Sequence, residues 1–199
     1  MTVTAIADVG DTLISLLKAT SGIPADKIEL FSPAEVEGQD IRLTLFLYDI
    51  LETPELKNQN RLLVSPTQSR AAPLYLNLYY LLTSHLPPGM AGGPTAQTLE
   101  AHRNLGRAMR VFYDNGILAG TVLRGALAGT GAELRLTLNP MSVEDMTRVW
   151  SLFPESNYRP SVAYLVTPAS IDSDRLLDEQ RVVERRGDFD HVVPTRREA

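Results

Sequence analysis

The chain has 199 residues, which is enough for one substantial hydrophobic core and too few to require two. It contains no cysteine, which excludes disulfides, thiolate catalysis and cysteine-ligated metal sites. The first residues lack the basic start and apolar run of a signal peptide, and no apolar stretch reaches the roughly 18 residues of a membrane helix. We therefore expect a soluble protein that is made in the cytoplasm and does not insert directly into a membrane.

The net charge of −5 is distributed unevenly along the chain. Residues 1–60 hold ten acids and four bases, residues 61–135 three acids and seven bases, and residues 136–199 eleven acids and eight bases. A basic middle between acidic ends is typical of surfaces that complement other copies of the chain or a protein partner, and it is too weakly basic for a nucleic-acid groove. A randomly mixed surface is the alternative explanation.

The N-terminal third predicts one helix followed by two strands. Apolar residues such as Val9, Leu13 and Leu17 recur at helical spacing over residues 4–20. A short strand is expected at residues 27–31. Leucines alternate with other residues over 41–51, and because both faces are largely apolar, this segment is predicted to be a central strand.

Residues 52–72 contain two prolines and no sustained period, so they are interpreted as a long excursion without an element, of the kind that is usually functional or mobile. A strand follows at 74–83. It is expected to pair antiparallel with 41–51, because nothing between the two resembles a crossover helix.

A long helix is predicted at 95–115, ending at Asn115-Gly116. One stripe of this helix carries Leu99, His102, Leu105, Met109 and Phe112, which predicts its buried face. Arg103, Arg107 and Arg110 fall on another stripe.

The remaining elements are a strand at 132–138, a helix capped by Ser142 that carries Trp150, and a strand at 161–167. After Ile171 the sequence becomes polar and densely charged. The predicted fold class is α+β, with a mainly antiparallel central sheet and amphipathic helices packed against it, in residues 1–172. Residues 173–199 are predicted to form a charged C-terminal extension.

The three histidines of the chain, His85, His102 and His191, give little evidence of a catalytic site. His102 lies on the apolar stripe of its helix, where a hydrogen-bonded packing residue is the favoured interpretation over a general acid or base. No serine occupies a glycine-flanked turn between a strand and a helix, so a hydrolase triad is unsupported. We predict no catalytic residue.

Phosphate and metal sites are also unsupported by the sequence. The glycines of 116–131 fit neither the dinucleotide spacing nor the phosphate loop, which needs a lysine that this segment lacks, and close backbone packing explains them better. Acidic pairs such as Glu144-Asp145 have no convergent histidines or calcium-loop spacing. We therefore predict no cofactor and no metal.

Arginine outnumbers lysine sixteen to three. This bias favours forked contacts at interfaces, so Arg103, Arg107 and Arg110 are predicted interface residues. A solvated helix face, with arginine favoured only by the base composition of the genome, is the alternative.

Several ordered blocks characterise the middle of the chain: PLYLNLYYLL at 73–82, AHRNLGRAMR at 101–110, LRG at 123–125 and ELRLTLNPMSVEDMTRVW at 133–150. Residues 161–164 and Ile171-Asp172 close the pattern. Together these blocks, over about residues 4–172, resemble the cap, or tail-terminator, proteins of extracellular contractile injection systems, which are phage-tail-like particles.

The resemblance implies a structural protein rather than an enzyme. Such caps form a homohexameric ring on the last layer of the inner tube and contractile sheath, end their growth and link sheath to tube, so the implied partners are other copies, the sheath protein and the inner tube protein. Assembly is expected in the cytoplasm, within a particle that is either released or anchored. A contractile phage tail terminator is the nearest alternative; a small enzyme or anion-binding domain using His102 and Arg107 is the more distant one.

The C-terminal extension suggests one further interaction. Arg181, Val182 and Val183 begin a short β-branched segment that could add a strand to the sheet of a sheath subunit. An unstructured end is the alternative, and both remain open at this point.

Overall fold

The computed structural model describes residues 3–36, 38–57, 59–89 and 91–178. Within them the helices are α1 (Ala5–Thr20), α2 (Gly93–Asp114) and α3 (Val143–Trp150). The strands are β1 (Ile28–Glu29), β2 (Leu43–Glu52), β3 (Leu62–Ser65), β4 (Gln68–Arg70), β5 (Leu74–Ser84), β6 (Ile117–Ala119), β7 (Glu133–Asn139), β8 (Ser161–Ile171) and β9 (Leu176–Asp178).

The main sheet has the strand order β1-β2-β5-β8-β7-β6. All its pairings are antiparallel except that of β1 with β2. β2 pairs with β5 in the predicted antiparallel direction, with Leu43 opposite Ser84. The α+β class with a mainly antiparallel sheet is therefore confirmed.

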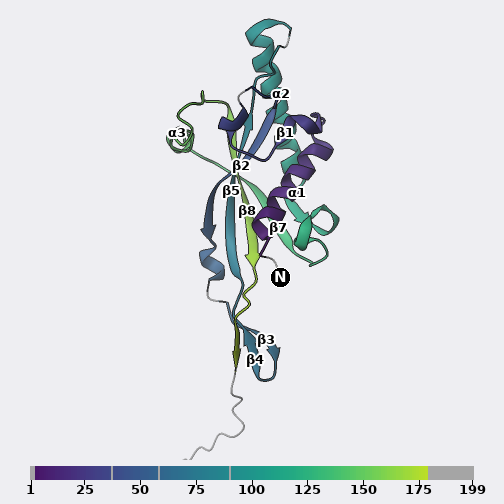
Figure 1. Ribbon diagram of the computed structural model, residues 1–199, viewed down its shortest axis with the longest axis vertical. Helices are drawn as coiled ribbons and strands as arrows, with labels where there is room; N and C mark the ends of the chain where they lie inside the picture. The colour runs from purple at the N-terminus through teal and green to yellow at the C-terminus, as the bar shows by residue number, and fades with distance from the viewer. Residues whose placement is uncertain (1–2, 37, 58, 90, 179–199) are drawn as a thin grey trace, which may run out of the picture.

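Helices cover both faces of this sheet (Figure 1). On one face, α1 and α2 pack over alternate strand residues such as Leu45 and Leu78, and α1 contributes Leu13 to this larger core. On the other face, α3 forms a smaller core in which Trp150 and Phe153 pack near Leu81. Because both faces are covered, the central strands are apolar on both sides, which is why their sequences gave the strongest strand signals.

The glycine-rich segment after β6 packs on the N-terminal half of α1 through polar contacts. Thr12 Oγ1 donates to Asp8 O (2.7 Å) and accepts from the backbone N–H of Arg124 (3.0 Å). Asp8 Oδ2 accepts from the N–H of Ala126 (3.1 Å). Gly125 sits directly against the Asp8 carboxylate at φ +58°, where a side chain would collide with it. This close approach agrees with the packing interpretation of these glycines.

The interpretation of residues 52–72 as an excursion without an element was wrong. The segment contains a short 3-10 helix, Pro54–Leu56, and the hairpin of β3 and β4. β4 pairs with β9, which lies in the segment expected to be a C-terminal extension. β3, β4 and β9 form a second, three-stranded antiparallel sheet, here called the arm, which projects from one end of the long strands β2, β5 and β8 (Figure 1).

The predicted buried stripe of α2 was partly wrong. His102 is exposed, and Leu99 is 48% exposed. The buried residues of α2 are Ala101, Asn104, Ala108, Val111 and Phe112. The first turns of α2 extend beyond the sheet (Figure 1), which leaves Leu99 exposed. At Ala101 the helix already contacts Ser84 of β5, and it turns Ala101 and Asn104 toward the sheet instead of His102.

Candidate interface surfaces

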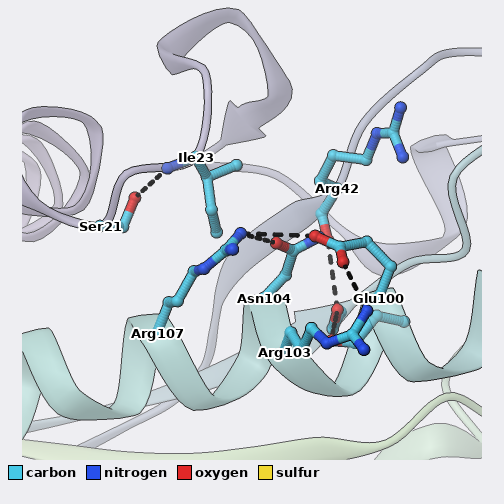
Figure 2. A network of polar contacts seen from close by, with 9 residues as sticks. Ser21, Ile23, Arg42, Glu100, Arg103, Asn104 and Arg107 are labelled. Atoms are coloured by element: carbon cyan, nitrogen blue, oxygen red, sulfur yellow. Dashed lines mark hydrogen bonds and ion pairs between the residues drawn. The ribbon is translucent and has the colours of Figure 1, made fainter.

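Two of the three arginines in the predicted stripe on α2 form ion pairs with one carboxylate. Glu100 receives Arg103 Nη1 at 3.2 Å and Arg107 Nη1 at 3.4 Å, and Arg107 also donates to Asn104 Oδ1 at 3.1 Å. Figure 2 shows these side chains on α2, with Arg42 across from them. The arginines lie at the surface, with Arg103 59% exposed, but their charge is shared with Glu100.

A second ion cluster borders this network at the start of β2. The Asp40 carboxylate forms ion pairs with Lys27 Nζ, 3.2 Å from Oδ2, and with Arg42 Nε, 2.8 Å from Oδ1. Partial burial acts to raise the pKa of Asp40, but Lys27 and Arg42 outweigh it and hold that pKa below its usual value. Arg103, Arg107, Lys27 and Arg42 therefore already have carboxylate partners. Since His102 is exposed on α2, an anion site built from His102 and Arg107 gains no support.

Arg110 behaves differently from the other two arginines. It has no ion pair within the described residues, and it lines an apolar groove of about 740 Å³ between the C-terminal half of α2 and strands β6 and β7. The groove is lined by Met109, Arg110, Phe112, Tyr113, Gly116, Ile117, Arg135, Leu136, Thr137, Leu138 and Tyr164. Tyr113 is 88% exposed and Ile117 60% exposed, so the apolar groove is open at the surface.

The arm is the second exposed apolar surface. Leu62, Leu63 and Val64 of β3 are 53%, 74% and 52% exposed, and Leu176 of β9 is 50% exposed. Contiguous exposed apolar side chains of this kind mark interaction sites in folded proteins. Sequence reasoning missed this surface, although Leu62-Leu63-Val64 followed by Ser65-Pro66 is a short apolar run before a turn and was a usable hairpin signal.

His85 is a buried structural residue. Its Nε2 lies 2.9 Å from Thr44 Oγ1 of β2. Burial, assisted by the nearby charge of Arg159, lowers the pKa of His85 to about 4. The imidazole is therefore neutral at pH 7 and packs in the fold in the way that was predicted for His102.

Arg181, Val182, Val183 and His191 lie outside the described residues. In the part of the chain that the structure describes, no group of three or more histidine, aspartate and glutamate side chains could hold a metal ion. No helix of that part is long and apolar enough to cross a membrane.

Comparison with known proteins gives a family and two similar folds. The sequence matches the model of the Pvc16 N-terminal domain over residues 8–185. A search of curated protein sequences found no match.

One similar solved structure is the PVC sheath/tube terminator of an extracellular contractile injection system in the extended state. Its TM-score is 0.62 at 18% identity, with 94% of this chain and 64% of that chain covered. Another is the tube-terminating cap of the anti-feeding prophage, with a TM-score of 0.59 at 19% identity, covering 92% of this chain and 61% of that chain. The chain thus spans just under two thirds of the length of these relatives.

The resemblance to cap proteins of contractile injection systems is thereby confirmed. The family match extends over most of the chain and past the arm, and the described elements follow the fold of two terminators. This chain belongs to the family of the Pvc16 N-terminal domain.

Proposed function

We propose that this protein is a terminator of a contractile injection particle. It forms a hexameric ring that ends the inner tube and the contractile sheath and links one to the other. The observation that supports this is the fold likeness over 94% of the chain to a sheath/tube terminator, together with the family match. The partners are other copies of the chain, the sheath protein and the inner tube protein.

The surface chemistry of the described residues is consistent with this role. A ring needs contact surfaces and a stable scaffold, and needs no reactive centre. The arm and the apolar groove offer two exposed apolar surfaces, and Arg110 is an unpaired cation beside one of them. Contacts that are weak in one copy gain strength when six copies meet a sixfold tube, because each further contact forms at a high effective concentration.

Within this proposal, the C-terminal segment that begins with Arg181, Val182 and Val183 donates a strand to a sheath subunit. Alternating main-chain hydrogen bonds of an added strand provide affinity without a preformed pocket. The α2 arginines contribute to contacts between copies, with Arg110 foremost because no carboxylate of the described chain neutralises it.

Electron microscopy of particles assembled without this protein tests the function. We expect tubes and sheaths of variable, excessive length, and sheaths that detach from tubes. Supplying the wild-type gene in trans should restore uniform particles. Joined sheaths and tubes of normal, uniform length in its absence would contradict the terminator role.

The ring size is tested separately by native mass spectrometry and by symmetry analysis of end-on images of particle tips. Six copies are expected. Another copy number on a sixfold tube, or a chain that is absent from the tip, would contradict the hexameric cap.

A further inference from the structure

The main sheet has a free margin at each end. At one end β1 pairs only with Leu43 and Thr44, so the rest of β2, as far as Glu52, has no described strand on its outer side. Over the lower half of the sheet β2 forms the margin (Figure 1). At the other end β6 is the last strand. A free strand edge presents unpaired main-chain groups to which another chain can add a strand.

One cross-strand row runs from margin to margin and ends in an exposed aliphatic side chain on each side. Ile117 of β6 pairs with Arg135 of β7, which pairs with Thr167 of β8. Thr167 Oγ1 donates to Oδ1 of Asn77 in β5, and Asn77 pairs with Leu51 of β2. Ile117 is 60% exposed and Leu51 48% exposed. The two margins therefore carry an apolar side chain at the same height and on the same face of the sheet.

The main-chain groups of Ile117 point outward from the sheet. The N–H of Leu136 in β7 donates to the C=O of Gly116 at 2.9 Å, so Gly116 faces β7. Because successive residues of a strand turn their main-chain groups to opposite sides, the N–H and C=O of Ile117 point away from β7. Ile117 thus offers one donor and one acceptor to a strand beside it.

The edge of β2 offers the matching groups. The N–H of Thr53 donates to the C=O of Tyr75 at 2.9 Å, so Glu52 and Ile50 turn their main-chain groups away from β5. The Ile50 N–H donates to the carboxylate of the preceding residue at 2.9 Å, which leaves the Ile50 C=O and the Glu52 N–H directed to the open side. A parallel strand that places one residue opposite Leu51 uses these two groups, one as acceptor and one as donor.

The strand directions agree with a ring. The pairings that lead from β2 through β5, β8 and β7 to β6 are all antiparallel, so β6 runs in the same direction as β2. Rotation about an axis along the strands preserves this direction and places β6 of one copy parallel to β2 of the next. β1 already pairs with β2 in the parallel sense, further along the same edge. One edge of each kind per copy is what a head-to-tail interface requires.

The charges beside the two margins are opposite, and the described ion pairs leave them available. Asp49 lies on the same face as Leu51, is exposed, and has no ion pair within the described residues. Arg135 lies next to Ile117, its side chain is 67% exposed, and its described ion pair, with Glu133, is long at 3.7 Å. Opposite charges beside an apolar contact set its orientation and disfavour other pairings.

We propose that β6 of one copy pairs with the free edge of β2 in the next copy, with Ile117 against Leu51, and that this strand pairing is the repeating contact of the ring. The inference rests on the proposed function, because a closed ring uses one edge of each kind in every copy. Six such heterologous contacts close the ring and leave neither margin of the sheet unpaired.

Disulfide trapping in assembled particles tests this contact, because the chain has no cysteine of its own. The double variant Leu51→Cys, Ile117→Cys should give a ladder of cross-linked species up to the size of the ring on mild oxidation. Within one copy these positions are four strand spacings apart, about 19 Å, which is too far for a disulfide, so every cross-link joins two copies. The matched control is Leu74→Cys, Ile117→Cys. Leu74 is 44% exposed but lies on β5, between β2 and β8, so this pair should give no ladder.

A charge exchange across the contact gives an independent measurement. Leu51→Asp and Ile117→Lys each place a charge in the apolar contact, so each should weaken ring assembly roughly tenfold or more. The two substitutions together place opposite charges across the interface and should recover much of the loss. Leu74→Asp is the control and should assemble as the wild type does. End-on images of particle tips measure the fraction that carries a ring, and circular dichroism checks that each variant is folded.

Absence of a ladder from particles with Leu51→Cys and Ile117→Cys, or absence of recovery in the charge pair, would overturn the inference. A dimer of Ile117→Cys alone would also overturn it, because two β6 edges would then meet each other. Overlong tubes in the absence of the protein, with no such cross-link in its presence, would mean that the terminator role holds and that the ring uses another contact. A cross-linked ring, with tubes of normal length in the absence of the protein, would mean that the contact holds and the terminator role does not.

Discussion

The buried residue His85 makes the free energy of unfolding depend on pH. Its pKa is lowered from 6.5 to about 4, because burial disfavours the charged imidazole. The folded state therefore binds the proton more weakly than the unfolded state does. The contribution of His85 to the free energy of unfolding is fully present above pH 6.5. It is lost as the pH falls from there toward 4, and the total loss is about 3 kcal/mol.

His85→Gln should remove this pH dependence, since a neutral amide does not titrate. The free energy of unfolding, from urea denaturation at several pH values between 7.5 and 4, measures it. The matched control is His102→Gln, at an exposed histidine, which should retain the wild-type slope. An identical slope for His85→Gln and wild type would show that His85 does not carry the effect.

Gly125 gives a second residue-scale prediction. Gly125→Ala combines a positive φ with a collision against the Asp8 carboxylate, so it should destabilise the protein by roughly 2–3 kcal/mol. Gly129→Ala is the control, because its φ is +75° but nothing lies within 4 Å, and it should cost only about 1 kcal/mol. Urea denaturation at pH 7 compares the two; equal losses would mean that the contact with Asp8 is unimportant.

At the scale of elements, the start of α3 illustrates a prediction from sequence that the structure confirms. Ser142 Oγ accepts from the N–H of Asp145 at 3.1 Å, as expected for a helix N-cap. Ser142→Ala should therefore cost about 1 kcal/mol in the free energy of unfolding. Ser151→Ala, at the exposed C-terminal end of the same helix, should be nearly neutral. A Ser142→Ala loss no larger than that of Ser151→Ala would argue against the cap.

The elements that could be predicted are those whose signal is local. β2 and β5 carry long alternating apolar patterns, and the α3 cap lies within four residues, so both were recognisable in the sequence. The arm was missed because its third strand pairs Leu177 with Ser69, more than one hundred residues away, and three-residue strands have no period of their own. The apolar groove could not be predicted either, because it exists only once α2 lies against β7. Nothing in the sequence distinguishes Tyr113 and Ile117. Only their exposure in the structure marks them as candidate contact residues.

At the scale of the whole molecule, the long strands place the arm at one end of the domain, and β9 of the arm is the last described element. Under the proposed function, residues 181–183 bind a sheath subunit, whereas the α2 arginines contribute to contacts between copies. Ring formation and sheath attachment are thus expected to depend on different residues, and this separation can be tested.

Deleting residues 179–199 should weaken attachment to the sheath and leave the ring intact, because the deletion removes residues 181–183 and retains every described helix and strand, from α1 to β9. Val182→Asp with Val183→Asp in the full chain should act similarly, since two charges disfavour the apolar side of an added strand. Arg196→Ser with Arg197→Ser is the control outside the β-branched segment. Co-sedimentation with assembled sheath measures attachment, and native mass spectrometry measures the ring. Unchanged sheath binding in both variants would exclude strand donation, whereas a lost ring would show that the segment acts between copies instead.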